Sequence, residues 1–278
     1  MSSIENFAVV GASGTVGIPI TTALLSAGFH VTAITSSTST STSTFPPSVT
    51  IARVNYHTAL VARFMPSEFG IDLAGCCDTQ IGALLGQKRE IIEYLGKLAG
   101  KYDWFTWTAL STGSFIDWLQ YFVSHFTAYI HIVLKPTDMF EMHFENKMAR
   151  IYDSGNKLYY PSTLSFVGKS VAAVLKKPAE TANKYLTVAS FTTSQREVLK
   201  IVEEMGERFQ FIPGETSNLE IIGDEKMARG DGDAFVEYLI RHVFGDGAGG
   251  AIEDNAAGLL GLEEEDLRTV VKRVLSEL

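Results

Sequence analysis

Three glycines near the start of the sequence have the spacing of a phosphate-binding loop. Gly11, Gly14 and Gly17 follow a short apolar run, Phe7–Val10, and precede an apolar helical pattern that ends at Gly28. A strand, a glycine turn and a helix start, in that order, form the cradle that holds the pyrophosphate of a dinucleotide. The spacing therefore predicts nucleotide binding.

Each glycine has its own expected part in such a cradle. Gly11 would permit the tight turn, Gly14 would let backbone N–H groups approach the pyrophosphate, and Gly17 would let the helix pack close to the strand. The phosphates would then lie at the positive N-terminal end of the helix. The cofactor-binding residues expected in this loop are Gly11, Ser13, Gly14, Thr15, Val16 and Gly17. The alternative is an ordinary turn between a strand and a helix.

Lys88 is the candidate for proton-transfer chemistry. The apolar spacing predicts an amphipathic helix over Ile81–Ala99, and Lys88 falls in the gap of its apolar stripe, between Leu84 and Ile91. A lysine on that side either extends its amine to water or has its pKa lowered by desolvation. A lowered pKa is what general acid–base catalysis near neutral pH requires. Spacing alone leaves both possibilities open.

The elements that would position these groups alternate between strand and helix. Further strands are predicted at Phe29–Thr35, Val49–Val54, the start of Ala62–Ile71, Trp104–Ser111 and Lys184–Ser190. Further helices are predicted at Ser165–Leu175, Thr192–Met205, Leu262–Leu278 and Asp224–Phe244, the last interrupted at Gly230–Gly232. This order predicts an α/β fold, a Rossmann-type parallel sheet with helices on both faces. Residues 1–190 would form the NAD(P)-binding domain, and residues 191–278 a smaller, mainly helical substrate lobe.

Composition excludes several classes of protein. The chain has 278 residues, 46% hydrophobic and 20% charged, with a net charge of −9 and no basic block, so nucleic-acid binding is not expected. The longest apolar run, Phe115–Leu134, contains too many polar residues for a membrane span. The adjacent Cys76 and Cys77 and the scattered histidines do not have the spacing of metal ligands, so no metal is expected. Free thiols and the lack of a secretory leader predict a cytoplasmic protein.

The end of the second strand bears on the choice of cofactor. An acid there favours the free ribose of NAD, whereas an arginine favours the 2′-phosphate of NADP. This chain has Thr35, Ser36 and Ser37. The absence of an acid favours NADP, with Ser36 near the adenosine end, but no cation replaces the acid in this stretch, so NAD stays possible.

Three segments in order resemble one protein family. They are GASGTVG at Gly11–Gly17, RFMPSEFG at Arg63–Gly70 and QKREIIEYL at Gln87–Leu95. Together they resemble the NmrA-like, isoflavone reductase-like proteins, an atypical branch of the short-chain dehydrogenases. Two further segments, Trp107–Trp118 and Lys184–Leu199, resemble the fungal members.

The resemblance implies an NADP-dependent oxidoreductase that transfers a hydride to a small aromatic or enone-type substrate. It assigns Lys88 as the general acid/base and places Thr112, Gly113 and Phe115 near the nicotinamide. For Phe115 an ordinary core position is the alternative. The chain has no Tyr-x-x-x-Lys pair, so the tyrosine-dependent mechanism of the commoner short-chain dehydrogenases is not expected.

Three departures from the family pattern leave room for functions other than an active reductase. Ser36 stands where members have an arginine, residues 55–63 are too short for the helix, strand and helix found there, and an insertion near 120–144 has no counterpart. Without that strand the sheet must either close a gap or leave an apolar edge exposed. One hypothesis covers the last two departures: an exon lost and an intron retained in a predicted gene product. The alternatives are therefore a non-catalytic NAD(P)-sensing regulator and an inactive product of a faulty gene prediction.

Overall fold

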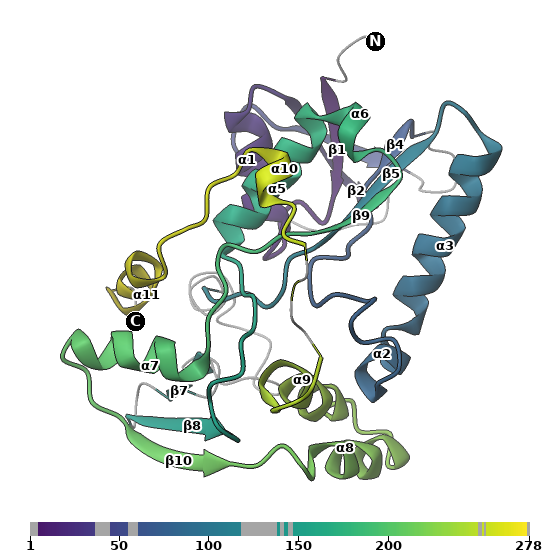
Figure 1. Cartoon of the computed structure of the whole chain (residues 1–278). Helices are drawn as coiled ribbons and strands as arrows, with labels where there is room; N and C mark the ends of the chain where they lie inside the picture. Colours follow the sequence, from purple (N-terminus) through teal and green to yellow (C-terminus); the bar gives the residue numbers. More distant parts are fainter. Residues whose placement is uncertain are drawn as a thin grey trace.

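The computed structural model describes residues 5–36, 45–54, 61–117, 138–139, 142–143, 147–249, 252 and 254–276. Nearly all of the predicted insertion near 120–144, and residues 55–60 of the shortened segment, lie outside these ranges. Figure 1 shows an upper body of parallel strands and helices, with β8, β10 and α7–α9 below it. The predicted α/β class is confirmed.

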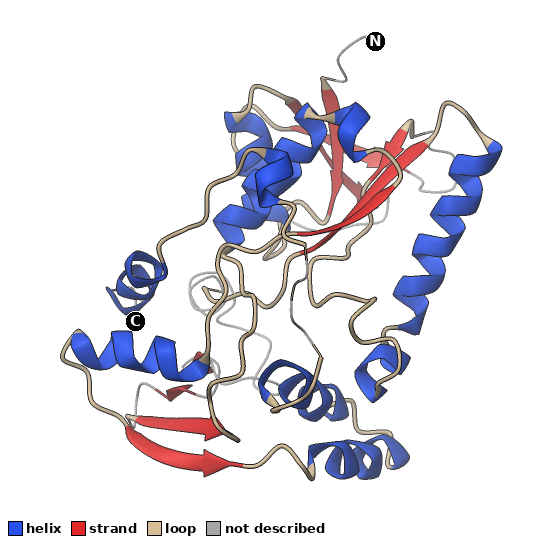
Figure 2. Ribbon diagram, in the orientation of Figure 1, coloured by secondary structure: helices blue, strands red, loops and turns tan. Residues whose placement is uncertain are grey.

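The upper body contains two parallel sheets of three strands each (Figure 2). The first has the order β1 (Asn6–Val10), β2 (His30–Ser36), β3 (Thr50–Val54), and the second β4 (Arg63–Phe64), β5 (Thr106–Ser111), β9 (Lys184–Thr187). The helices of this body are α1 (Gly17–Ser26), α3 (Gly86–Lys101), α5 (Leu164–Lys176), α6 (Pro178–Thr181) and α10 (Ala257–Leu260).

A break separates the two sheets where the sequence lacks a strand. Among the described strands, β1 pairs only with β2 and β4 pairs only with β5. Val10, at the end of β1, is 66% exposed. The shortened segment was expected to leave either a closed gap or an exposed apolar edge, and the described residues show the second outcome.

Helix packing, rather than a strand ladder, joins the two sheets. Val31 of the first sheet and Leu110 of the second belong to one core that also contains Leu24 of α1 and Phe166 of α5. The backbones of α1 and α5 approach closely at Gly168, where an added Cβ would lie 2.5 Å from the carbonyl oxygen of Pro19. The helix pair therefore spans the break.

The second sheet has helices on both faces, as predicted. Leu110 of β5 packs towards α5, whereas its neighbour Ala109 packs with Trp107 against Leu95 of α3. Successive residues of a strand point to opposite faces, so these two cores lie on opposite sides of β5. Among the residues of α3, the face around Leu95 is the buried one.

The predicted helix over Ile81–Ala99 is wrong in one respect, because the structure divides it at Leu85. The short helix α2 (Gln80–Leu84) is capped by the Thr79 hydroxyl and packs on α9, and α3 begins at Gly86. Leu84 and Ile91 are 38% and 44% exposed. The stripe on which Lys88 was placed is therefore largely exposed, and Ile81 is buried against a different partner from Leu95.

The lower body is built around a parallel pair of strands. β8 (Met148–Tyr152) pairs with β10 (Gln210–Gly214), and the two-residue strands β6 (Asp138–Met139) and β7 (Met142–His143) extend this sheet. Its helices are α7 (Gln195–Glu204), α8 (Leu219–Ala228), α9 (Ala234–Phe244) and α11 (Leu267–Ser276). The helix predicted over Thr192–Met205 begins later, at Gln195, because the Ser194 hydroxyl caps it by accepting the N–H of Glu197.

Contacts cross the predicted division at residue 190 in both directions. β8 precedes it but pairs with β10, which follows it. The segment before α10 returns to the upper body, where the N–H of Ala256 donates to the carbonyl of Thr187 at 2.8 Å. The division into residues 1–190 and 191–278 stays a prediction. None of the helices in the described ranges has the length and apolar character needed to cross a membrane.

Candidate functional site

The glycine loop has the backbone geometry expected of a phosphate cradle. Gly11 has φ +72°, in the region that favours glycine, and its carbonyl accepts the N–H of Gly14 at 2.9 Å. A Cβ added to Gly17 would lie 2.0 Å from that same carbonyl oxygen. A Cβ on Gly14 would lie 3.2 Å from it, which is tight but not impossible. Gly11 and Gly17 thus permit the turn and the close strand–helix approach.

The start of α1 leaves backbone N–H groups available to an anion. Its N-cap residue, Val16, has no side-chain acceptor, and the first turn contains no acidic residue. Ile18 donates to the carbonyl of Gly14, whereas the N–H groups of Ser13 and Thr15 meet no backbone acceptor within the described ranges. Ser13 and Gly14 are exposed. An uncapped helix N-terminus of this kind fits a phosphate group.

Arg53 is a cation beside the residues predicted to lie at the adenosine end of the cofactor. Ser36 is the last residue of β2, and its neighbour Thr35 is paired in register with Arg53 of β3. Linear sequence reasoning missed Arg53 because the residue lies on the adjacent strand. The register of two parallel strands is the information that places it next to Thr35.

Lys88 is held at the turn that carries the PSEFG segment. Its Nζ donates to the carbonyl oxygen of Ser67 at 2.5 Å and lies 3.6 Å from Oε2 of Glu68. The Lys88 side chain is 38% exposed, whereas that of Glu68 is 2% exposed. Burial raises the pKa of the Glu68 carboxyl, and the nearby Lys88 ammonium opposes that rise. The amine is therefore half-exposed and fixed by the turn, rather than inserted into an apolar core.

The same turn is bonded to the predicted nicotinamide-side residues. The carbonyl of Gly70 accepts the N–H groups of Thr112 and Gly113, both at 3.0 Å. Gly113 has φ +66°, and a Cβ there would lie 1.7 Å from the carbonyl oxygen of Tyr160. Phe115 is half-buried and forms an isolated β-bridge with Ser162. The fold thus brings Lys88 and the Thr112–Gly113 turn to opposite ends of the segment Ser67–Gly70.

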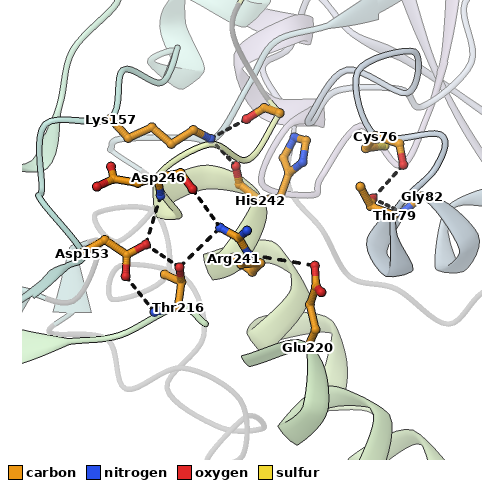
Figure 3. Close-up of polar contacts among 11 residues, drawn as sticks. Cys76, Thr79, Gly82, Asp153, Lys157, Thr216, Glu220, Arg241, His242 and Asp246 are labelled. Carbon is orange, nitrogen blue, oxygen red and sulfur yellow. Dashed lines mark hydrogen bonds and ion pairs between the residues drawn. The ribbon is translucent and has the colours of Figure 1, made fainter. Parts of the chain in front are cut away.

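Sequence reasoning missed a cleft that is lined by residues of α2, α8, α9 and the glycine-rich loop after α9; Figure 3 shows Glu220, Arg241 and His242 from this lining. This cleft has a volume of about 220 Å³ and is lined by Gln80, Glu220, Tyr238, Arg241, His242 and Gly247–Gly249, among others. His242 is 4% exposed, and neither of its ring nitrogens has a hydrogen-bond partner among the residues that the structure describes. Burial and the charge of Lys157 lower the pKa of His242 to about 4, so the imidazole is neutral at pH 7. The sequence feature that could have indicated this cleft is the spacing of Tyr238 and His242, which are four residues apart and therefore on one face of a helix.

Metal chemistry finds no support in the described part of the chain. Within the described ranges, no group of three or more His, Cys, Asp or Glu side chains is placed to hold a metal ion.

Comparisons with known proteins agree on the fold. No protein-family model matches the chain. The sequence is 27% identical to the oxidoreductase poxI of Penicillium oxalicum, over 95% of this chain and 92% of that protein. The structure matches leucoanthocyanidin reductase of Vitis vinifera, solved with NADPH, with a TM-score of 0.70 and 15% identity, covering 98% and 99% of the two chains. An isoflavone reductase matches with a TM-score of 0.65 and 15% identity, covering 97% and 99%. The fold implied by the sequence resemblance is therefore confirmed.

Proposed function

We propose that this chain, which has the fold of the isoflavone and leucoanthocyanidin reductases, is an NADP-dependent oxidoreductase that reduces a small aromatic or enone-type substrate. The observation that carries the proposal is the position of Lys88. Its amine is fixed at Ser67, and the same turn is bonded through Gly70 to the Thr112–Gly113 turn. The name of the Penicillium relative and the NADPH in the Vitis structure support the proposed reaction class.

The cofactor site of this proposal is built mainly from backbone. The loop Gly11–Gly17 and the uncapped start of α1 would hold the pyrophosphate. Ser36 would lie at the adenosine end, with Arg53 offering a cation to the 2′-phosphate of NADP. Thr112, Gly113 and Phe115 would line the nicotinamide end. When bound, NADPH supplies the hydride.

Lys88 would supply the proton. The Nζ ammonium would donate to the substrate atom that becomes negatively charged during reduction. Its hydrogen bond to the Ser67 carbonyl fixes the direction of the side chain, and Oε2 of Glu68 lies 3.6 Å from the amine. Burial raises the pKa of the Glu68 carboxyl, and the Lys88 ammonium is the neighbouring charge that opposes this rise.

A regulator that binds NAD(P) without turnover is the second candidate. The observation that favours it is the split sheet, because β1 has one strand partner among the described strands and Val10 is 66% exposed beside the cradle. An incomplete crevice can retain the phosphate cradle and still fail to position a substrate. The third possibility, an inactive product of a faulty gene prediction, depends on segments outside the described residues.

The expected location of the protein is the cytoplasm. Cys76 is buried and Cys77 is exposed, and both are free thiols. Free cysteines are typical of reducing compartments. The proposed partner is a small-molecule substrate.

Fluorescence titration with NADPH and NADH, followed by turnover assays, tests the proposal. We expect NADPH to bind and to be oxidised with at least one compound from a panel of aromatic enones and phenylpropanoid esters. Binding without turnover would favour the regulator, and binding of neither nucleotide would reject both. Sequencing the transcript tests the gene-prediction hypothesis, which an mRNA encoding this chain unchanged would exclude.

A further inference from the structure

His242 is a buried polar side chain that the fold leaves without a partner. It is 4% exposed, it lines the 220 Å³ cleft, and both Nδ1 and Nε2 lack hydrogen bonds to the described part of the chain. More than nine in ten buried polar groups in proteins are hydrogen-bonded, and an unsatisfied one costs free energy. A ring with two free nitrogens that faces a cavity of this size indicates a ligand.

The backbone around His242 holds the ring in place without satisfying it. Lys157 Nζ donates to the carbonyl oxygens of His242 and Gly249, and these bonds attach the glycine loop to α9 (Figure 3). Gly249 lies against the imidazole, since an added Cβ would be 3.3 Å from its Cε1. The same Cβ would be 2.7 Å from the carbonyl oxygen of Gly75. The loop therefore closes one side of the cleft and lies against one edge of the imidazole.

Arg241 presents a guanidinium group with unused donors. Its Nη1 lies 3.4 Å from both Thr216 Oγ1 and the carbonyl of Asp246, and its Nε lies 3.9 Å from Glu220 Oε1. These are long contacts, and strong arginine–carboxylate pairs are shorter. Within the described ranges, no acceptor contacts Nη2. The guanidinium thus retains donors for a carboxylate.

The charges around the cleft are mixed, because Glu220 lines it beside Arg241 and Asp153 lies within electrostatic reach of the same guanidinium. Lys157 is bonded to two carbonyl oxygens rather than to a carboxylate, and burial together with Arg241 lowers its pKa to about 8. Asp246 and Asp72 are the acids that act on Lys157 and His242, and they only partly offset the lowering of the two pKa values. These acids offset part of the charge of Lys157 and Arg241, so the unused donors of Arg241, rather than a net positive potential, are what a carboxylate ligand would use.

The size of the cleft limits the ligand to a small molecule. A cavity of about 150 Å³ is enough to hold benzene. The 220 Å³ here suits one ring with two polar substituents. A neutral imidazole has one donor nitrogen and one acceptor nitrogen, and a hydroxyl group both donates and accepts.

We propose that this cleft binds a small aromatic carboxylate that also carries a ring hydroxyl. The carboxylate pairs with Arg241, and the hydroxyl bonds to His242. The side chains of Arg241 and His242 have no part in the proposed cofactor site or in the proposed role of Lys88.

The cleft also adjoins the proposed catalytic region. His242 lines a second, much smaller cavity together with Ile71, Gly113 and Ser114, so one ring separates the cleft from the predicted nicotinamide-side turn. The idea that this ligand is the substrate of the reductase rests on the proposed function. The binding of the ligand to the cleft is independent of that function.

Isothermal titration of the cofactor-free protein with 4-hydroxybenzoate tests the proposal, with 4-hydroxybenzamide and benzoate as probes that lack the charge or the hydroxyl. We expect 4-hydroxybenzoate to bind more tightly than either. Arg241→Gln should weaken its binding about tenfold or more, the usual scale for a charge-assisted hydrogen bond. His242→Phe should weaken it about fivefold and leave benzoate nearly unchanged. Arg229→Gln, an exposed arginine at the end of α8, is the matched control and should bind as the wild type does.

Three results would overturn the site: no binding of 4-hydroxybenzoate by the wild type, equal affinity for the three probes, or wild-type binding by both cleft variants. Arg241 is partly exposed, so Arg241→Gln remains informative if His242→Phe does not fold. Titration of the same sample with NADPH separates this proposal from the previous one. NADPH binding without 4-hydroxybenzoate binding rejects only the cleft. The reverse result supports the cleft and rejects the reductase.

Discussion

The glycine cradle and the His242 cleft are assembled in opposite ways. The cradle comes from seven consecutive residues, Gly11–Gly17, and offers backbone N–H groups. The cleft draws side chains from Gln80 on α2, Glu220 on α8 and Arg241 and His242 on α9. A site made by one local turn is written in one stretch of sequence, whereas a site made by distant segments depends on how the helices pack.

The two sites also differ in what they cost the protein without a ligand. The N–H groups at the start of α1 lie next to exposed residues, where water can bond to them. The nitrogens of His242 are buried, and leaving a buried polar group unsatisfied costs about 1–3 kcal/mol. The cradle therefore costs little when empty, whereas the buried imidazole of the cleft lowers the stability of the fold.

Gly17→Ala should produce the largest effect in the molecule. Its methyl group would lie 2.0 Å from the carbonyl oxygen of Gly11, so the loop must move away from the start of α1. We expect NADPH binding to fall by more than about 100-fold in a fluorescence titration, because both the turn and the helix start change. Gly96→Ala on α3 has open space around its Cβ and is the matched control.

The same variant also tests whether the two regions are independent. Binding of 4-hydroxybenzoate in the cleft should be unchanged in Gly17→Ala, because no residue of the cradle lines it. Wild-type NADPH affinity in Gly17→Ala would show that the glycine loop is only a structural turn.

Lys88→Ala comes next in expected size. Loss of a general acid/base lowers kcat by about 10²-fold or more, and NADPH affinity should change little because Lys88 lies outside the glycine loop. Steady-state kinetics with a substrate identified from the enone panel measures it. Lys97→Ala, an exposed lysine on the same helix, should keep wild-type turnover. A Lys88→Ala enzyme with normal kcat would remove this residue from the mechanism.

Much of the upper body could be predicted from local patterns. The strands at β1, β2, β3 and β5 and the helices α1 and α5 lie close to their predicted ranges, because each has its own apolar period and turn residues. Lys88 and the PSEFG turn were linked in the sequence only by family resemblance, and the structure brings them into contact. The open edge of β1 followed from the shortened segment after β3.

The features that the sequence did not predict share one physical cause, because each of them depends on tertiary contacts. The division at Leu85 occurs because Ile81 packs with Tyr238 of α9 while Leu95 packs with Trp107 of β5. Arg53 joined the cofactor region only through its register with Thr35. His242 looked like another residue of a helix face, since no local pattern tells whether its nitrogens find partners.

Arg53→Gln tests whether the cofactor site extends beyond the glycine loop to a residue that strand register places beside Thr35. If the guanidinium contacts the 2′-phosphate, NADPH affinity should fall about tenfold while NADH affinity stays the same, since NADH lacks that phosphate. Parallel fluorescence titrations with the two nucleotides measure the ratio, and Arg229→Gln is the control. Equal losses for both nucleotides would mean that Arg53 supports the sheet rather than the phosphate.

His242→Phe should change the free energy of unfolding only slightly, but the direction of that change shows whether His242 serves the fold or a ligand. A phenyl ring is planar like imidazole, its one extra ring atom can extend into the cleft, and it has no nitrogen to leave unsatisfied, so the free energy of unfolding should rise by about 1 kcal/mol. For a chain of this size that is about 2–4 °C in Tm by differential scanning calorimetry. His30→Phe, at an exposed histidine on β2, should give no such gain. A more stable protein that has lost its hydroxyl-dependent ligand binding would mean that the buried histidine is kept for the ligand and not for the fold. A less stable one would mean that His242 has a structural partner, and the contrast with the cradle would disappear.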